Sequence, residues 1–286
     1  MREDFGGLRV LALESRREKE IASLIRGAGG LPTVVPVMRE VPLESNQDAF
    51  AFAQSLLEAK FDVVVFLTGA GARILFNAVL TRFSRDEFFA ALSRTTTVVR
   101  GPKPVAALRE FGVAPNVVSP SPSTWREVLA SLDTAYPKGL HGLRIAVQEY
   151  GAVNQPLLDG LGQRGALVTR VPVYQWALPD NLDLIRATIR DLVRGEHDVV
   201  LFLTGIQALH LLQVADGMQQ REPLLDSFRR MVVVSIGPST TEELMRQGIA
   251  PDFQPTQSKM GILVSQAAAV AMRLLESKRA GLPVLE

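Results

Sequence analysis

Residues 62–69 read Asp-Val-Val-Val-Phe-Leu-Thr-Gly, and residues 198–205 read Asp-Val-Val-Leu-Phe-Leu-Thr-Gly. Seven of the eight positions are identical, at an offset of 136 residues along the chain. Each stretch is short, apolar and rich in β-branched side chains, which is typical of a strand buried on both faces of a parallel sheet. A helical pattern follows each stretch. Thr68 and Thr204 are therefore expected at the carboxyl end of a strand and the amino end of a helix, where ligands bind in open α/β sheets.

The match extends beyond this stretch at the same offset. Gly101-Pro102 corresponds to Gly237-Pro238, and Gly112 corresponds to Gly248. Because the glycines and prolines match as well as the apolar core, we interpret the chain as two copies of one βα unit rather than as a coincidence between apolar strands. The predicted fold class is α/β, with two Rossmann- or flavodoxin-like parallel-sheet domains built from an internal sequence repeat.

Prolines mark one predicted strand as peripheral. The strand predicted at 33–37 is flanked and interrupted by Pro32, Pro36 and Pro42. Proline has no N–H to donate to a neighbouring strand, so this segment is expected at a sheet edge or outside the sheet.

The composition excludes several classes of function. The chain has 286 residues, of which 47% are hydrophobic, which is enough for two domains. Its formal net charge of +1 gives no global electrostatic argument for a nucleic-acid or membrane partner, and neither partner is expected. There is no cysteine, so disulfide and thiolate chemistry are excluded. The three histidines, at positions 141, 197 and 210, form no ligand-like cluster, and no metal site is expected.

The sequence also shows no recognisable targeting signal. Residues 1–8 are polar and contain glycine, unlike a secretory signal. No uncharged apolar run reaches the ~18 residues that span a bilayer. A cytoplasmic protein is therefore expected.

The sequence lacks a nucleotide-binding fingerprint. Residues 69–71 read Gly-Ala-Gly without the third glycine of a dinucleotide loop, and the Walker spacing does not occur. No Ser/His/Asp arrangement stands out. A nucleotide-dependent enzyme is disfavoured, and no cofactor is expected.

Polar groups and glycines gather instead at the carboxyl ends of the predicted strands. The candidate substrate-binding residues are Arg16, Thr68, Gly101, Lys103, Gly151, Thr204, Gly205, Gly237, Ser239 and Thr240. For each hydroxyl the alternative is helix capping, and for each cation it is a solvated surface charge. As a set they cluster where ligands bind, and cations with unpaired backbone N–H groups favour a polyanionic ligand.

With these residues in view, the chain resembles the uroporphyrinogen-III synthase family over nearly its whole length. The most specific segment is Ile-Gly-Pro-Ser-Thr at 236–240 followed by Gly248, and Val-Tyr-Gln at 173–175 is the next most specific. The remaining matching segments are Leu8–Arg16 with Gly30 and Pro36, the strand after Asp62, and Asp198–Thr204.

The resemblance implies two α/β domains joined by a two-stranded linker, with an active-site cleft between the domains. Residues 36–40 and 172–176 are the expected linker strands. Domain one then comprises residues 1–38 plus 175–286, and domain two comprises residues 39–174.

The resemblance also implies a cofactor-independent lyase that acts on a small molecule, the linear tetrapyrrole hydroxymethylbilane. The implied reaction closes the macrocycle to uroporphyrinogen III with loss of water and inversion of ring D. Such an enzyme must hold ring D for attack at its substituted carbon and help the hydroxyl group to leave. A monomer is expected.

By the same resemblance, Tyr174 is the expected catalytic residue, which assists hydroxyl loss. The alternative for Tyr174 is a linker tyrosine that packs between the domains. Thr204 and Thr240 match family hydroxyls that face the substrate, and Thr68 matches the equivalent hydroxyl in the other domain. Arg16 matches an arginine that follows the first strand.

The chain departs from the family pattern in three places. Residues 69–72 read Gly-Ala-Gly-Ala where polar or basic residues often occur, Pro104 replaces a threonine of some members, and Arg17 replaces a frequent proline. These departures keep open a non-catalytic, regulatory paralogue that binds a tetrapyrrole or an anion. A third interpretation is a two-lobed binding protein for a small polar ligand.

Overall fold

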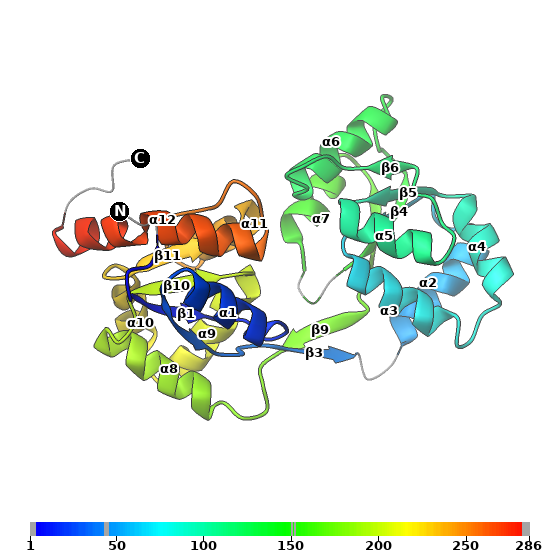
Figure 1. The fold of residues 1–286 in the computed structure, drawn as a ribbon. Helices are drawn as coiled ribbons and strands as arrows, with labels where there is room; N and C mark the ends of the chain where they lie inside the picture. Colours follow the sequence, from blue (N-terminus) through cyan, green and yellow to red (C-terminus); the bar gives the residue numbers. More distant parts are fainter. Residues whose placement is uncertain (1–3, 43–45, 150, 152, 282–286) are drawn as a thin grey trace. The chain divides into compact units, whose positions relative to one another are not determined.

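The computed structural model divides the chain into two compact units, which are drawn in Figure 1. Unit 1 comprises Met1–Arg39 and Ala177–Glu286, and unit 2 comprises Glu40–Trp176. The boundaries expected from the sequence, after residues 38 and 174, lie one and two residues before these. The residues that the structure describes are 4–42, 46–149, 151 and 153–281.

Unit 1 is built on a four-stranded parallel sheet with the strand order β11-β10-β1-β2. Its elements are β1 (Arg9–Ala12), α1 (Glu18–Gly27), β2 (Leu31–Val34), α8 (Asp183–Arg194), β10 (Val199–Phe202), α9 (Gly205–Gly217), α10 (Arg221–Phe228), β11 (Val232–Ser235), α11 (Pro238–Arg246) and α12 (Met260–Arg279).

Both faces of this sheet are covered, because successive side chains of a strand point to opposite faces. In β10, Val200 and Phe202 pack with residues of α8, α9, α10 and α11. Val199 and Leu201 pack with residues of α1 and α12 on the other face. The continuous apolar run of β10 follows from this two-sided burial, as the sequence predicts.

Unit 2 has the same architecture around a five-stranded parallel sheet with the order β6-β5-β4-β7-β8. Its elements are α2 (Gln47–Leu57), β4 (Val63–Phe66), α3 (Gly69–Val79), α4 (Arg85–Ser93), β5 (Thr96–Val99), α5 (Pro102–Glu110), β6 (Val117–Val118), α6 (Trp125–Ala135), β7 (Arg144–Gln148), α7 (Gln155–Gln163) and β8 (Leu167–Val171).

The sheet of unit 2 is also buried on both faces. In β4, Val64 and Phe66 pack with residues of α2, α3, α4 and α5. Val63 and Val65 pack with residues of α6 and α7. The two parallel-sheet α/β units confirm the predicted fold class.

The segments that match in sequence occupy corresponding places in the two units. From β4, α3, β5 and α5 to β10, α9, β11 and α11, each element begins 136 residues later in the chain. The origin of this correspondence in an internal repeat stays a prediction.

A separate two-stranded sheet pairs β3 (Arg39–Pro42) with β9 (Tyr174–Ala177) at the two boundaries between the units. The bounds predicted for these strands, 36–40 and 172–176, are wrong by one to three residues. Both strands begin after the proline that opens the predicted segment, since a proline nitrogen cannot donate to the partner strand.

Two other strands show the same effect of proline. β2 lies at the edge of its sheet, as predicted, but it spans Leu31–Val34 with Pro32 inside it, so the predicted bounds 33–37 are wrong by two or three residues. The sequence pattern also predicts a strand at 251–254, and this prediction is wrong, because only an isolated bridge between Phe253 and Val234 forms there. Pro251 and Pro255 flank that bridge and limit its hydrogen bonding.

Helix α12 is long and apolar enough, by length and composition alone, to cross a membrane. Its apolar side chains are accounted for by the core of unit 1, where Leu263, Ala267 and Ala271 are fully buried. They pack against alternate residues of β10 and β11.

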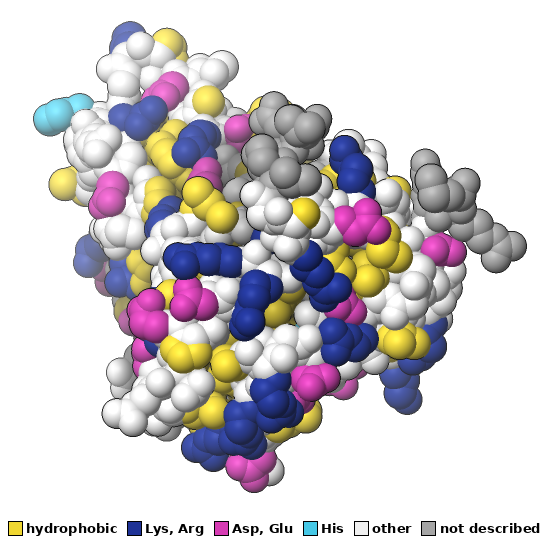
Figure 2. Space-filling model, turned by 90° about the vertical axis from the view of Figure 1, so that its left-hand side faces the viewer, with side chains coloured by type: hydrophobic (Ala, Val, Ile, Leu, Met, Phe, Trp, Pro, Cys, Tyr) yellow, Lys and Arg dark blue, Asp and Glu magenta, His cyan; other side chains and the backbone are white. Residues whose placement is uncertain are grey.

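Charged side chains of both signs share the surface. Figure 2 shows one face, on which Lys and Arg side chains are spread widely, with acidic side chains beside many of them. Several ion pairs join residues three apart on one helix, such as Arg186 with Asp183 and Arg229 with Asp226. Exposed pairs of this kind contribute little stability each.

Stronger ion pairs lie at the amino ends of the central strands. Asp198, just before β10, accepts hydrogen bonds from the backbone N–H and the Nε of Arg9 at 2.9 and 3.0 Å. Burial by itself raises the pKa of Asp198, but hydrogen bonds from Arg9 and Arg279 outweigh it and lower the pKa to about 2. In unit 2, Asp62 accepts the same two bonds from Arg144 at 2.8 and 3.1 Å, and they lower its pKa.

We predict that Asp198→Asn destabilises unit 1. The folded-state pKa of Asp198, about 2, lies below its ordinary value of 3.8. The carboxylate therefore stabilises the fold above pH ~4, and this contribution is lost as the pH falls towards 2. Urea unfolding should show a deficit of about 2 kcal/mol at pH 7 that shrinks in acid.

Asp226→Asn is the matched control, because Asp226 forms an exposed pair with Arg229 in the same unit. It should change the unfolding free energy by less than about 0.5 kcal/mol at either pH. A deficit for Asp198→Asn that did not depend on pH would contradict the prediction.

Candidate functional site

The predicted site residues fall into two groups, one in each unit. Those in unit 1 are Arg16, Thr204, Gly205, Gly237, Ser239 and Thr240, and those in unit 2 are Thr68, Gly101, Lys103, Gly151 and Tyr174. All except Tyr174 follow the carboxyl ends of strands, namely β1, β10 and β11 in unit 1 and β4, β5 and β7 in unit 2. Each group therefore shares one edge of its sheet, and the functional roles stay predictions.

Thr68 caps helix α3. Its Oγ1 accepts a hydrogen bond from the N–H of Gly71 at 3.1 Å. This is the capping role that the sequence left open as the alternative. A hydroxyl that accepts at a cap keeps its own proton for donation, so capping does not exclude contact with a ligand.

A buried glutamine that the sequence analysis missed organises the edge of unit 1. Gln207 is fully buried, and its side-chain oxygen accepts from the N–H of Leu203 at 2.7 Å and of Thr204 at 3.2 Å. Its side-chain N–H donates to the carbonyl of Leu13. One amide therefore joins the ends of β10 and β1. The Thr-x-x-Gln spacing from Thr204 to Gln207 is a capping-box signal that would have found it.

Gln148 has a similar structural role in unit 2. It is fully buried at the end of β7, and its oxygen lies 3.4 Å from the N–H of Thr68, which donates to it. Its side-chain N–H donates to the carbonyl of Glu149. The carboxylate of Glu149 is itself buried and accepts two bonds of 2.9 Å from Arg170. No local pattern in the sequence marks Gln148, because its partner Thr68 is distant in the chain.

Close helix packing accounts for two glycines at these edges. A Cβ on Gly205 would lie 2.5 Å from the Cβ of Glu243 on α11. A Cβ on Gly69 would lie 2.5 Å from the carbonyl oxygen of Lys103 on α5. Gly205 is predicted to bind substrate, but packing against α11 is by itself a reason for a glycine at this position. The small residues at 69–72, a departure from the family pattern, begin at the same kind of contact.

The two Gly-Pro turns are each packed against a serine. A Cβ on Gly101 would lie 2.9 Å from the Oγ of Ser123, and a Cβ on Gly237 would lie 2.2 Å from the Oγ of Ser258. Each turn opens a helix with proline at its first positions. The structure therefore places a serine hydroxyl beside each predicted glycine, which the sequence analysis missed because both serines come from later loops.

The polar side chains of these edges differ in exposure. Lys103, Arg16 and Ser239 are exposed, whereas Thr240 is 94% buried. The loop after β1 is held by Glu14, whose carboxylate accepts from the N–H of Arg16 at 2.7 Å. Arg16 and Lys103 are therefore accessible from solvent, and their roles toward a ligand stay predictions.

Tyr174 lies in the core of unit 2. Its side chain is 5% exposed, and its ring contacts the ring of Trp176 edge-on at 5.6 Å between centroids. Gly151 has a φ of +66°, and its N–H donates to the carbonyl of Tyr174 at 3.2 Å. A Cβ on Gly151 would lie 2.0 Å from the Trp176 indole. These contacts show a packing role for both residues, and their roles toward substrate stay predictions.

The described residues contain no group of three or more His, Cys, Asp or Glu side chains arranged to hold a metal ion.

We predict that Gln207→Leu destabilises unit 1 by about 2–4 kcal/mol, because two backbone N–H groups and one carbonyl lose their buried partner. Gln213→Leu is the control, since Gln213 is exposed on the same helix. Urea unfolding followed by circular dichroism measures both variants. Equal stability of the two would show that the buried amide does not tie the strand ends together.

The chain matches known proteins in both sequence and fold. Residues 19–265 match the family model described as uroporphyrinogen-III synthase HemD. The chain is 30% identical to the uncharacterized Bacillus subtilis protein YjjA, over 92% of this chain and 95% of that protein. It is 28% identical to a Methanothermobacter thermautotrophicus protein provisionally named a uroporphyrinogen-III synthase, over 82% of this chain and 87% of that protein.

Solved structures agree with the sequence matches in fold. A mutant uroporphyrinogen III synthase of Thermus thermophilus superposes with a TM-score of 0.71 at 23% identity, covering 95% of this chain and 100% of that chain. The Helicobacter pylori enzyme superposes with a TM-score of 0.52 at 13% identity, covering 92% and 99%. The chain therefore belongs to the uroporphyrinogen-III synthase family.

Proposed function

We propose that this protein is a uroporphyrinogen-III synthase, a lyase that cyclises hydroxymethylbilane with inversion of ring D and loss of water. The observation that carries the proposal is the family match over residues 19–265, which includes every predicted site residue except Arg16. The family acts on a small-molecule tetrapyrrole. The proposal goes further and assigns hydroxymethylbilane as the substrate of this chain and cyclisation as its reaction. A cytoplasmic monomer belongs to the same proposal and rests on the sequence alone.

The chemistry of both sheet edges suits a polycarboxylate. Helices α3 and α5 in unit 2, and α9 and α11 in unit 1, all begin at the carboxyl edge of their sheet. Helix amino termini attract anions through the helix dipole and their free N–H groups. Exposed Lys103 and Arg16 add positive charge at these edges. Neutral donors spread over these edges would make many weak contacts with the substrate. Such contacts control the substrate's conformation better than one strong bond does.

The proposed chemical step needs a proton donor for the departing hydroxyl group. Tyr174 is our candidate, since a phenol can donate a proton to a leaving group. Its burial beside Trp176 supports the alternative packing role. Substitution at this position separates the two.

The reaction is tested by generating hydroxymethylbilane in situ, adding the protein, oxidising the products and separating the uroporphyrin isomers. We expect excess isomer III over a control without protein. The bilane also closes without enzyme to isomer I, so isomer I alone from folded protein would contradict the proposed reaction.

The role of Tyr174 is tested by Tyr174→Phe, which keeps the ring and removes the hydroxyl. If Tyr174 donates the proton, kcat should fall by roughly 100-fold, the lower range for general acid catalysis. Tyr136→Phe is the control, because the Tyr136 hydroxyl bonds only with Thr96 among the contacts described. Unchanged kcat in Tyr174→Phe, with an intact fold, would remove Tyr174 from the mechanism.

The second candidate function is a non-catalytic, regulatory protein of the same fold that binds a tetrapyrrole or an anion. The burial of Tyr174 and the small residues at 69–72 favour it. A protein of this kind would bind the ligand but form no excess of isomer III. The isomer assay therefore distinguishes it from the proposed synthase.

A further inference from the structure

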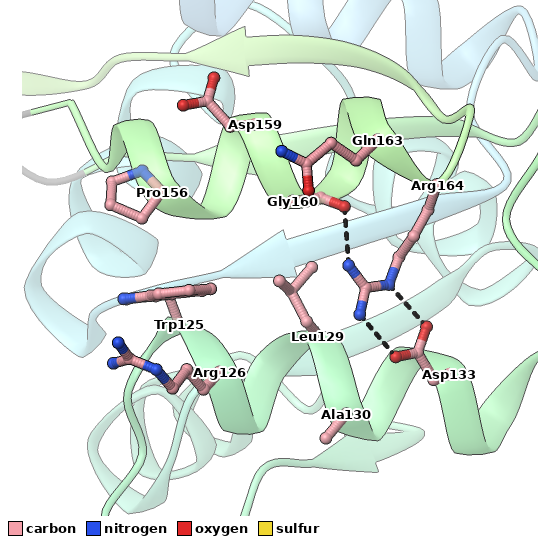
Figure 3. Close-up of a pocket in the computed structure, with 10 residues that line it drawn as sticks. All are labelled: Trp125, Arg126, Leu129, Ala130, Asp133, Pro156, Asp159, Gly160, Gln163 and Arg164. Carbon is pink, nitrogen blue, oxygen red and sulfur yellow. Dashed lines mark hydrogen bonds and ion pairs between the residues drawn. The ribbon is translucent and has the colours of Figure 1, made fainter.

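A hollow of about 440 Å³ lies between helices α6 and α7 of unit 2 (Figure 3). This volume falls within the ~300–1,000 Å³ typical of small-molecule sites. None of the residues that line it belongs to the predicted site. Its two ends differ in chemistry, and the difference indicates which ligand it suits.

One end is closed by an ion pair between the helices. Arg164 on the loop after α7 donates through Nε and Nη2 to the carboxylate of Asp133 on α6, at 2.7 and 2.8 Å. Its Nη1 also donates to the carbonyl of Gly160 at 2.9 Å. In the middle the helices touch, since a Cβ on Gly160 would lie 2.4 Å from Leu129 Cδ1. Arg164 is thus bonded within the protein at this end, and the opposite end, at Trp125 and Pro156, is called the open end.

The open end carries a flat aromatic surface. Figure 3 shows the Trp125 ring between the Arg126 guanidinium on one side and Pro156 of α7 on the other. The guanidinium carbon lies 4.3 Å from the centroid of the indole. The ring face turned toward α7 borders the hollow, with the proline ring opposite. A planar, electron-rich ring fits such a slot by stacking.

Polar groups beside this slot complement a ring that carries an N–H and a carboxylate. Gln163 lines the hollow from α7 and offers an oxygen acceptor. Asp159 lines it too, but its carboxylate points away from Trp125 in Figure 3 and accepts from the side-chain N–H of Gln155 at 2.7 Å. Arg126 is exposed at the open end and is a cation. Both helices also begin at this end, so their dipoles add positive potential there.

The first turn of α6 is held in place before any ligand arrives. Thr124 and Glu127 form a capping box, in which the Thr124 N–H donates to Glu127 at 2.6 Å and the Arg126 N–H donates to Thr124 Oγ1 at 3.2 Å. The backbone positions of Trp125 and Arg126 are therefore set by the helix start. A ready-made site loses less entropy on binding.

We propose that this hollow is a subsite for one pyrrole ring of the linear tetrapyrrole, stacked on Trp125 and paired through a carboxylate side chain with Arg126. The inference rests on the proposed function and extends it to residues outside the predicted site. Helices α6 and α7 follow β6 and β7, so their starts lie at the same sheet edge as Lys103 and Gly151. A chain of linked pyrroles held at that edge can place one ring in the hollow.

The subsite is tested first by binding of a single ring. The probe is porphobilinogen, a monopyrrole with one acetate and one propionate side chain. The chain has two tryptophans, so its ¹H–¹⁵N spectrum has two indole signals, which Trp125→Phe assigns. We expect a saturable shift of the Trp125 signal and at least about a fivefold weaker Kd in Arg126→Gln. Arg94→Gln, an exposed arginine of the same unit, should bind like wild type.

The subsite is tested next in the reaction. Arg126→Gln should raise KM for the bilane by about fivefold or more, with kcat within about twofold of wild type, because it removes binding without touching the reacting carbon. Arg94→Gln should leave both constants unchanged. A Trp125 signal that does not shift with the probe, or equal KM values in the two variants, would overturn the subsite. If wild type forms no isomer III, the proposed reaction fails, while the titration still decides whether the hollow binds a pyrrole.

Discussion

The structure depends on two strands, β4 and β10, that are buried on both faces by helices. A strand in this position can carry only apolar side chains, because any polar group along it would lose water without gaining a partner. Polar chemistry is therefore confined to the ends of the strands. The amino ends hold the ion pairs of Asp62 and Asp198, and the carboxyl ends hold Thr68, Thr204 and the starts of the following helices. One constraint thus gives each sheet an amino edge of ion pairs and a carboxyl edge of helix starts, where the predicted site residues lie.

Buried amides cross-link the carboxyl edges of the two sheets. Gln207 joins the ends of β10 and β1, and Gln148 joins the end of β7 to Thr68. These bonds hold backbone N–H groups that would otherwise be unsatisfied, since each strand stops where a helix begins. Glycine at 69 and 205 lets the next helix approach closely.

The two units use one architecture with different details. Unit 1 covers one sheet face with α1 and α12, whereas unit 2 covers the corresponding face with α6 and α7. The shorter pair leaves a hollow between its helices, with an aromatic and a cationic side chain at the open end. One departure from the family pattern, the small residues at 69–72, begins at a helix contact, because Gly69 lies against the carbonyl of Lys103 on α5. Packing therefore accounts for this glycine as well as chemistry would.

The sequence by itself determined the α/β fold class, the two strands β4 and β10, and the helices that begin at the Thr-Gly pairs after them, because apolar periodicity and turn residues act locally. The sequence also indicated the family, through Ile-Gly-Pro-Ser-Thr at 236–240 and Gly248. Only the tertiary structure decided the bounds of β3 and β9, the burial of Tyr174 and the bridges made by Gln148. These depend on contacts between segments far apart in the chain, and no local pattern records which side chain a distant helix or strand will cover.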